Sequence, residues 1–207
     1  MKDNNFWRLQ MGREIEMKIP LSDEEYERLM KFAQEQEEKP VHICKKDEYF
    51  SKYDSEEERR AACKALKEPK VIRIRTEGES LDQKKSYFGI KFKTIEGGVE
   101  FNEEDETFVE DETVIRRFLE ISGFKKYFEK HKDSNALYCR SKADKDVLIH
   151  LELVIVNGHK YIETEVTDTS QEPQRVRKAL ESFLTELGLD ISKKDSRSWM
   201  EIIGSDS

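Results

Sequence analysis

The stretch that decides the fold is EIEMK, which runs Glu14, Ile15, Glu16, Met17, Lys18. Charged and apolar side chains alternate along it. Because successive side chains of a β-strand point to opposite faces, this alternation predicts a strand with one charged and one apolar face. Three later stretches alternate in the same way: VIRIR at residues 71–75, GIKFK at 89–93 and YIETEV at 161–166. We therefore expect a sheet that is charged on one side and apolar on the other.

Period-2 alternation marks eight segments as strands, and helical signals mark four more segments. The expected strands are residues 12–19, 41–51, 70–77, 86–94, 99–110, 124–132, 147–156 and 160–167. Two helices are predicted to begin at capping boxes, in which a serine is followed three residues later by a glutamate: Ser22 with Glu25, and Ser55 with Glu58. A third is expected over residues 111–122, and a fourth from Pro173 to just before Gly188.

The order of these segments favours an α+β fold. Strands and helices alternate at first, and then strands follow one another with a single helix inserted. We expect a closed eight-stranded antiparallel β-barrel with helices packed outside, since eight strands can close around a ligand. No linker rich in Pro, Gly or Ser divides the chain. Residues 1–11 are therefore expected to form an N-terminal extension, and residues 12–207 a single domain.

Composition excludes several classes of function. Of the 207 residues, 40% are charged, and 45 acidic against 37 basic residues give a net charge of −8. A chain this acidic lacks the positive surface that non-specific nucleic-acid binding needs, and it has no reason to prefer anionic membranes. The N-terminal residues lack the apolar stretch of a signal peptide, and no run approaches the ~20 apolar residues of a spanning helix. We expect a soluble cytoplasmic protein with no nucleic-acid or membrane partner.

Like-charged pairs at strand spacing are the feature that points to chemistry. The acidic pairs are Glu14 and Glu16, Glu104 and Glu106, Glu163 and Glu165; the cations are Lys18, Arg73, Arg75, Lys91, Lys93, Lys130 and Lys132. If these faces point outward, the sheet is an ordinary solvated one. If they point inward, the barrel has a lumen with acidic and basic walls. Such a lumen suits a polyanion held with hard divalent cations, because carboxylates bind the metal and Arg or Lys bind phosphate oxygens.

The sequence resembles the CYTH domain family, also called the triphosphate tunnel metalloenzymes. Glu14, Glu16 and Lys18 form the ExExK motif that opens this family's domain. KDEYF at residues 46–50 looks like its second strand, SGF at 122–124 like the end of its inserted helix, and RSWMEII at 197–203 like its terminal Arg-Ser-aromatic segment. The acidic and basic pairs follow in the family's order over nearly the whole chain.

The resemblance implies a β-barrel tunnel that binds a triphosphate and Mg²⁺ or Mn²⁺. It implies metal ligands at Glu14, Glu16 and Glu165, with Glu163 beside them; Glu104 and Glu106 fit the acidic fifth strand and are included. It implies that phosphates are gripped by Lys18, Arg73, Arg75, Lys91, Lys93, Lys130, Lys132 and Arg197. The catalytic set would be Glu14, Glu16 and Lys18. Family members sometimes dimerise, so a homodimer is a further expectation.

Three functions fit this resemblance, and a fourth alternative does not depend on it. The first is metal-dependent hydrolysis of inorganic triphosphate, a nucleoside triphosphate or thiamine triphosphate. The second is a class IV adenylate cyclase, which releases pyrophosphate; no adenine-specific signature is visible. The third is a non-catalytic module that binds polyphosphate or a nucleotide, and the fourth is an unrelated barrel with a solvated face. Retention of the acidic pairs argues against the binding module, since a binder needs cations more than metal ligands.

The remaining polar residues give weaker signals. The sixth-strand pair is Lys130 and Lys132 where an Arg is frequent in the family, and Glu152 stands in place of an expected Asp. Residues 54–70 look like an additional helix that could alter access to one tunnel mouth. Cys44, Cys63 and Cys139 have no CxxC spacing and are expected to be reduced thiols. The four histidines, at positions 42, 131, 150 and 159, have no spacing typical of a metal site.

Overall fold

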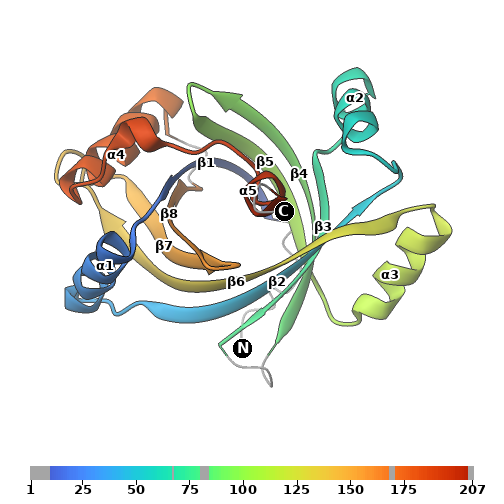
Figure 1. Cartoon of the computed structure of the whole chain (residues 1–207), viewed down its shortest axis with the longest axis horizontal. Helices are drawn as coiled ribbons and strands as arrows, with labels where there is room; N and C mark the ends of the chain where they lie inside the picture. The colour runs from blue at the N-terminus through green and yellow to red at the C-terminus, as the bar shows by residue number, and fades with distance from the viewer. Residues whose placement is uncertain (1–9, 67, 80–83, 168–170, 205–207) are drawn as a thin grey trace, which may run out of the picture.

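Eight antiparallel strands close into a barrel. The computed structural model describes residues 10–66, 68–79, 84–167 and 171–204, and side chains from residue 14 onward. The strands are β1 (Gln10–Pro20), β2 (Val41–Ser51), β3 (Val71–Gly78), β4 (Lys85–Glu96), β5 (Val99–Val109), β6 (Lys125–Arg140), β7 (Leu148–Val156) and β8 (His159–Val166). Their order around the barrel is β1-β5-β4-β3-β2-β6-β7-β8, and β8 pairs with β1 to complete the closure (Figure 1). The predicted closed eight-stranded antiparallel barrel is confirmed.

Three helices pack on the outer wall, and two more meet at one mouth of the barrel. They are α1 (Asp23–Glu35), α2 (Glu56–Leu66), α3 (Glu112–Ile121), α4 (Pro173–Glu186) and α5 (Trp199–Gly204), with a short 3₁₀ turn, η1 (Ile191–Lys193), between the last two. The predicted capping box of α1 is present: the Ser22 hydroxyl accepts from the Glu25 amide at 3.2 Å, and the Glu25 carboxylate accepts from the Ser22 amide at 2.8 Å. None of the helices in the described ranges is long and apolar enough to cross a lipid bilayer.

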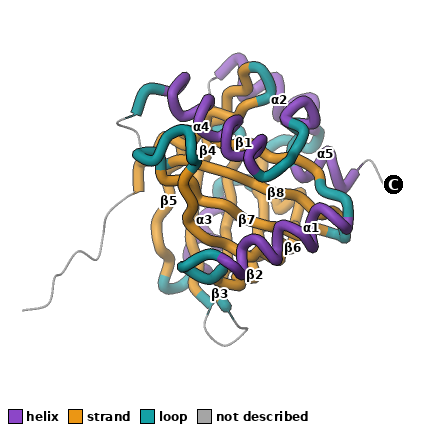
Figure 2. The backbone as a smooth tube through the Cα atoms, turned by 90° about the vertical axis from the view of Figure 1, so that its left-hand side faces the viewer, coloured by secondary structure: helices purple, strands orange, loops and turns teal. Residues whose placement is uncertain are grey.

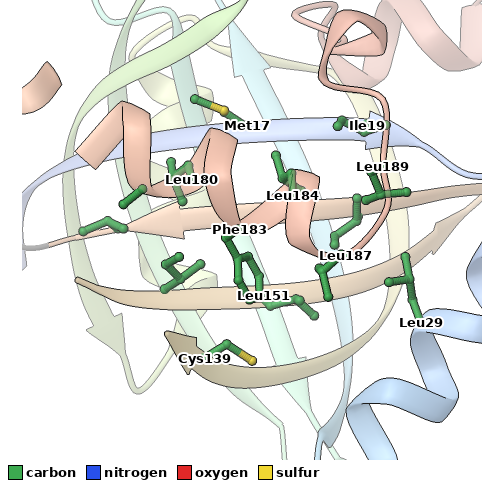
Figure 3. Packing of buried hydrophobic residues seen from close by; sticks show 14 of the residues in the cluster. Met17, Ile19, Leu29, Cys139, Leu151, Leu180, Phe183, Leu184, Leu187 and Leu189 are labelled. Atoms are coloured by element: carbon green, nitrogen blue, oxygen red, sulfur yellow. The ribbon is translucent and has the colours of Figure 1, made fainter. Parts of the chain in front are cut away.

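The main apolar core lies outside the barrel, not inside it. Met17 and Ile19 of β1 and Leu151 of β7 pack against Leu180 and Leu184 of α4, and all five are buried (Figure 3). Figure 2 faces this side of the molecule, where α1 and α4 cover the strands. Since a strand's side chains alternate between faces, packing the apolar face outward against helices sends the charged face inward. The position of α1 and α4 therefore decides that the lumen is charged.

A smaller core holds α3 on the other side of the barrel. Leu119 of α3 packs on Phe50 of β2 and Ile74 of β3, and Ile72 and Phe88 border this cluster. Asp111 caps the N-terminus of this helix, and its side chain accepts from the Thr113 amide at 2.9 Å. Both clusters use the residues that alternate with the charged ones, so the same pattern fixes the core and the lumen.

Two elements differ from the sequence prediction. Strand β6 continues to Arg140, beyond its predicted end at residue 132, and pairing with both β2 and β7 satisfies the backbone there. Helix α5 was not predicted, because its six residues are too few to show a helical period. The expected boundary between residues 11 and 12 falls inside β1, which begins at Gln10, and residues 1–9 lie outside the described part of the chain.

Candidate active site: a charged lumen

The charged pairs predicted from alternation all face one cavity. It has a volume of about 490 Å³ and lies inside the barrel. The predicted site residues that line it are Glu14, Glu16, Lys18, Arg73, Arg75, Lys91, Lys93, Glu104, Glu106, Lys130, Lys132, Glu163 and Glu165. The alternative of an outward, solvated charged face is therefore wrong for these strands. Charges of both signs are brought together inside one enclosure.

Acidic side chains gather where β1 and β8 meet. Glu16 is the register partner of Glu165, and Lys18 is the partner of Glu163. Burial raises the pKa of Glu16 to about 7, and repulsion from Glu100 and Glu163 adds to the shift. The described side chains of β1 and β8 that face the lumen form an acidic wall, in which the carboxyl groups outnumber the single cation, Lys18.

Glu14 belongs to the same acidic wall. Burial raises its pKa to about 7, partly opposed by Lys91, whose Nζ lies 3.1 Å from the Glu14 Oε2. Glu165 accepts from His150, with 3.0 Å between the His150 Nδ1 and the carboxylate oxygen. Glu14 and Glu16 are thus carboxyls that burial keeps from ionising fully at neutral pH.

Three other predicted acids are already paired with cations. Glu104 pairs with Arg73, and lies 3.1 Å from the Lys91 Nζ; these cations outweigh burial and lower the Glu104 pKa to about 2. Glu106 lies 3.0 Å from Arg73. Glu163 pairs with Lys132, which likewise helps to lower the Glu163 pKa to about 2 despite burial.

Arg73, Arg75 and Lys130 form a basic wall around Asp47. The sequence analysis did not single out Asp47. Its side chain is fully buried and accepts two hydrogen bonds from the Arg75 guanidinium, at 2.7 and 3.0 Å. The Lys130 Nζ lies 3.3 Å away, and the Tyr49 hydroxyl donates to the same carboxylate at 3.2 Å. Despite burial, Arg75, Lys130 and Arg73 hold the pKa of Asp47 well below its usual value.

Lys130 lies among aromatic side chains in the lumen. Burial lowers its pKa to about 8, and the attraction of Asp47 offsets only part of that effect. Its Nζ lies 5.6 Å from the centre of the Trp199 ring and 5.9 Å from that of Tyr49. Lys130 is therefore an ammonium group placed among aromatic faces, where an added anion would stabilise its charge.

A second unpredicted set joins β2, β6 and β7. Glu152 lies 2.5 Å from the Lys45 Nζ and 2.7 Å from the Lys132 Nζ, and it accepts from the Ser134 hydroxyl at 2.8 Å. Glu152 is the residue that stands where the CYTH resemblance leads one to expect an Asp. Lys45 and Asp47 escaped notice because residues 45–48 are all charged, which hides the alternation, although their odd numbers match the inward-facing Tyr49.

Helix α5 lies at one mouth of the lumen. The Trp199 indole donates to Glu163 at 2.9 Å and meets the Tyr161 ring edge-on, with 4.9 Å between ring centres. Ile202 packs on Val154 and Tyr161, so α5 is anchored to inward-facing side chains. Figure 1 shows α5 within the outline of the barrel.

The predicted phosphate ligand Arg197 is placed differently from the others. Its guanidinium binds Asp195 at 2.7 Å and is not among the described residues that line the cavity. Its backbone carbonyl instead accepts from Lys18. Lys18 also lies 3.4 Å from Glu100, which pairs with Lys93 as well.

The chemistry of the acidic wall suits a divalent metal ion, although the oxygens of its three carboxylates do not all lie within 4.8 Å of one another in this structure. Glu14 and Glu16 are buried and have a pKa of about 7, so a nearby positive charge would stabilise their ionised forms strongly. Glu165 adds a third carboxylate on the neighbouring strand. Oxygen-only donors of this kind match the preference of Mg²⁺ and Mn²⁺. A metal ion would stabilise the ionised forms of Glu104 and Glu163 less, because cations of the protein already neutralise these carboxylates.

Comparisons with known proteins agree on the fold. No family model matches the sequence, and no curated protein matches it. Among solved structures, a Pyrococcus horikoshii protein is 23% identical, with a TM-score of 0.69 over 94% of this chain and 99% of its own. A candidate adenylyl cyclase from Hippeastrum, described as having a dominant triphosphatase activity, is 18% identical, with a TM-score of 0.62 over 95% and 97%.

A third neighbour is a candidate adenylate cyclase from Vibrio parahaemolyticus. It is 14% identical, with a TM-score of 0.64 over 94% of this chain and 99% of its own. The closed barrel and these neighbours are consistent with the CYTH resemblance read from the sequence. At identities below 25%, the likeness concerns the fold.

Proposed function

We propose that the protein hydrolyses a triphosphate inside the barrel with the help of Mg²⁺ or Mn²⁺. The observation that carries this proposal is the division of one cavity into two walls. Carboxyls of raised pKa lie on β1, and the basic wall that Asp47 organises lies on β2, β3 and β6. Strand β2 is diametrically opposite β1 in the barrel order, so a ligand in the lumen has acids on one side and cations on the other.

The chain's own residues would bind and orient the substrate. Arg73 and Arg75 offer planar guanidinium groups for phosphate oxygens, and Lys91 and Lys93 add point charges on the next strand. In the lumen these cations form ion pairs with carboxylates, which fix their positions before a ligand enters. Their donors would neutralise the non-bridging oxygens as charge develops during phosphoryl transfer.

Glu14, Glu16 and Glu165 would hold the metal. When bound, a divalent ion supplies Lewis-acid polarisation of a phosphoryl oxygen and helps to form a nucleophilic water. Phosphoryl transfer relies on positioning and electrostatics, so it needs no Ser, Cys or His nucleophile. A cyclase would need the same phosphate-binding residues. Adenylate cyclase activity is therefore the second candidate function, which the candidate cyclases among the structural neighbours support.

Product analysis tests the proposal. Purified protein is incubated with inorganic triphosphate and, separately, with ATP, with Mg²⁺ or Mn²⁺ present, and all products are separated by chromatography. We expect orthophosphate. Formation of cyclic AMP and pyrophosphate from ATP would show that the protein is a cyclase and not a hydrolase. Binding of a triphosphate without any product would indicate a non-catalytic module.

A matched pair of variants tests the metal ligands. Glu16→Gln should abolish metal-dependent turnover, whereas Glu129→Gln, on the outer face of β6, should leave it unchanged. Inorganic triphosphate should still bind to Glu16→Gln, because the cations that hold phosphate remain. Turnover that survives in Glu16→Gln would show that the metal assignment is wrong.

A further inference from the structure

The outer wall of the barrel carries a cluster of three metal-ligating side chains that the lumen does not use. His42 and Cys44 lie on β2, and Asp133 lies on β6. One ligand atom from each lies within 4.8 Å of those of the other two. We propose that this cluster, the outer-wall triad, binds a zinc ion independently of the lumen.

Strand pairing fixes the triad's geometry. Cys44 and Asp133 are direct register partners, and His42 precedes Cys44 by two residues, so all three side chains point to the same outer face. The pairing of β2 with β6 is regular from Val41 to Tyr49. Linear spacing could not reveal the triad, because His42 and Asp133 are 91 residues apart in the sequence.

The contacts within the triad leave room for a cation. The His42 Nε2 lies 3.0 Å from the Asp133 Oδ1, a separation that two ligands of one metal ion can have. Within the described ranges, no Lys or Arg forms an ion pair with Asp133. By contrast Lys46, the next residue on this face of β2, is engaged with Glu129 at 3.3 Å. The Asp133 carboxylate thus has an imidazole partner but no permanent cation.

The surroundings make the triad both fixed and accessible. The His42 and Asp133 side chains are about half exposed, at 49% and 50%, so an ion can reach them from solvent. Next to them on β6, Asn135 lies beside the Tyr26 side chain of α1. A metal here would join two strands that are already hydrogen-bonded, with little rearrangement.

The donor set selects the metal. One thiolate, one imidazole and one carboxylate form a mixed S, N, O set that suits Zn²⁺, whereas Mg²⁺ prefers oxygen donors alone. Three protein ligands leave a fourth position for water. Binding requires the Cys44 thiolate, so one proton passes from the thiol to solvent for each ion bound. The triad and the all-carboxylate wall of the lumen should therefore take different metals.

Cobalt titration provides the test, since Co²⁺ reports thiolate ligation by a charge-transfer absorption band. The full chain is freed of metal with a chelator and titrated with Co²⁺ in the presence of excess Mg²⁺, which occupies hard oxygen sites. We expect a charge-transfer band that saturates at one ion per chain and is removed by Zn²⁺.

Variants assign the band to the triad. Cys44→Ser should abolish it, and His42→Ala should weaken Co²⁺ binding by at least ~10-fold, the loss typical of even an outer-shell metal partner. Cys63→Ser, which alters a thiol on α2, is the control and should keep it. Circular dichroism confirms that each variant is folded. A band that persists in Cys44→Ser, displacement of Co²⁺ by Mg²⁺, or no band in the wild-type chain would overturn the proposal.

Discussion

Replacing Asp47 by Asn should destabilise the protein far more than an ordinary loss of one charge. The substitution keeps the side-chain volume but removes the carboxylate that holds the Arg75 guanidinium at 2.7 and 3.0 Å and lies 3.3 Å from the Lys130 Nζ. Asp47 is completely buried, so its two partners would be left without their counter-charge inside the lumen.

The magnitude follows from the burial of this ion pair. Removing one partner of a buried pair typically costs about 3–5 kcal/mol. For a domain of this size each kcal/mol lowers Tm by roughly 2–4 °C, so the expected fall is about 6–20 °C. Asp54→Asn is the matched control. Asp54 is 79% exposed and pairs with Lys125 on the surface, where such pairs contribute about 0–1 kcal/mol.

Thermal melts at neutral pH, with and without inorganic triphosphate, measure the effect. The ligand should raise the Tm of Asp47→Asn more than that of the wild type, because its phosphates replace the missing negative charge. The depressed pKa of Asp47 also gives a pH dependence. Its stabilisation is present above the unfolded value of 3.8 and is lost as pH falls further. The reasoning is refuted if Asp47→Asn and Asp54→Asn melt at the same temperature.

Three further outcomes are expected. The pKa of Glu14 and of Glu16 is raised from 4.5 to about 7, so the metal-free protein should lose stability as pH rises from about 4.5 to 7. Saturating Mg²⁺ should flatten that decline in thermal melts; a decline that Mg²⁺ does not alter would exclude metal from these carboxyls. Trp199→Phe removes the hydrogen bond to Glu163 and should lower the free energy of unfolding in urea by about 1.5–3 kcal/mol. An unchanged urea midpoint would show that α5 is held by other contacts. Leu180→Ala should cost about 2–5 kcal/mol, yet calorimetry should find triphosphate binding unchanged, because Leu180 packs outside the barrel.

The fold was predictable because one pattern specifies two surfaces at once. In EIEMK, Ile15 and Met17 face the helices, while Glu14, Glu16 and Lys18 face the lumen. The choice between inward and outward charges was not contained in the pattern of any single strand. It depends on which face α1 and α4 cover, and the sequence showed those helices only as amphipathic segments.

The parts of the site that escaped prediction have identifiable physical reasons. Asp47 lies in a run of charged residues, so alternation gave no sign of which side chains turn inward. Glu100 precedes the acidic pair of its strand and shows its role only through contact with Lys18 and Lys93. Arg197 matches the expected segment, but Asp195, two residues away, holds its guanidinium. Long-range pairing determines the positions of Asp47 and Glu100, and local sequence does not encode it, whereas the Arg197 guanidinium is held by a local contact.

The most direct test of the central claim is calorimetric titration with inorganic triphosphate. The wild-type chain should bind one triphosphate, and Lys93→Met, which removes a cation from the lumen, should weaken binding by at least ~10-fold, equivalent to about 1.4 kcal/mol. Lys126→Met removes a cation from the outer face of β6 and should leave the affinity unchanged. Equal effects of the two substitutions, or no binding to the wild type, would contradict the account of a triphosphate-binding lumen.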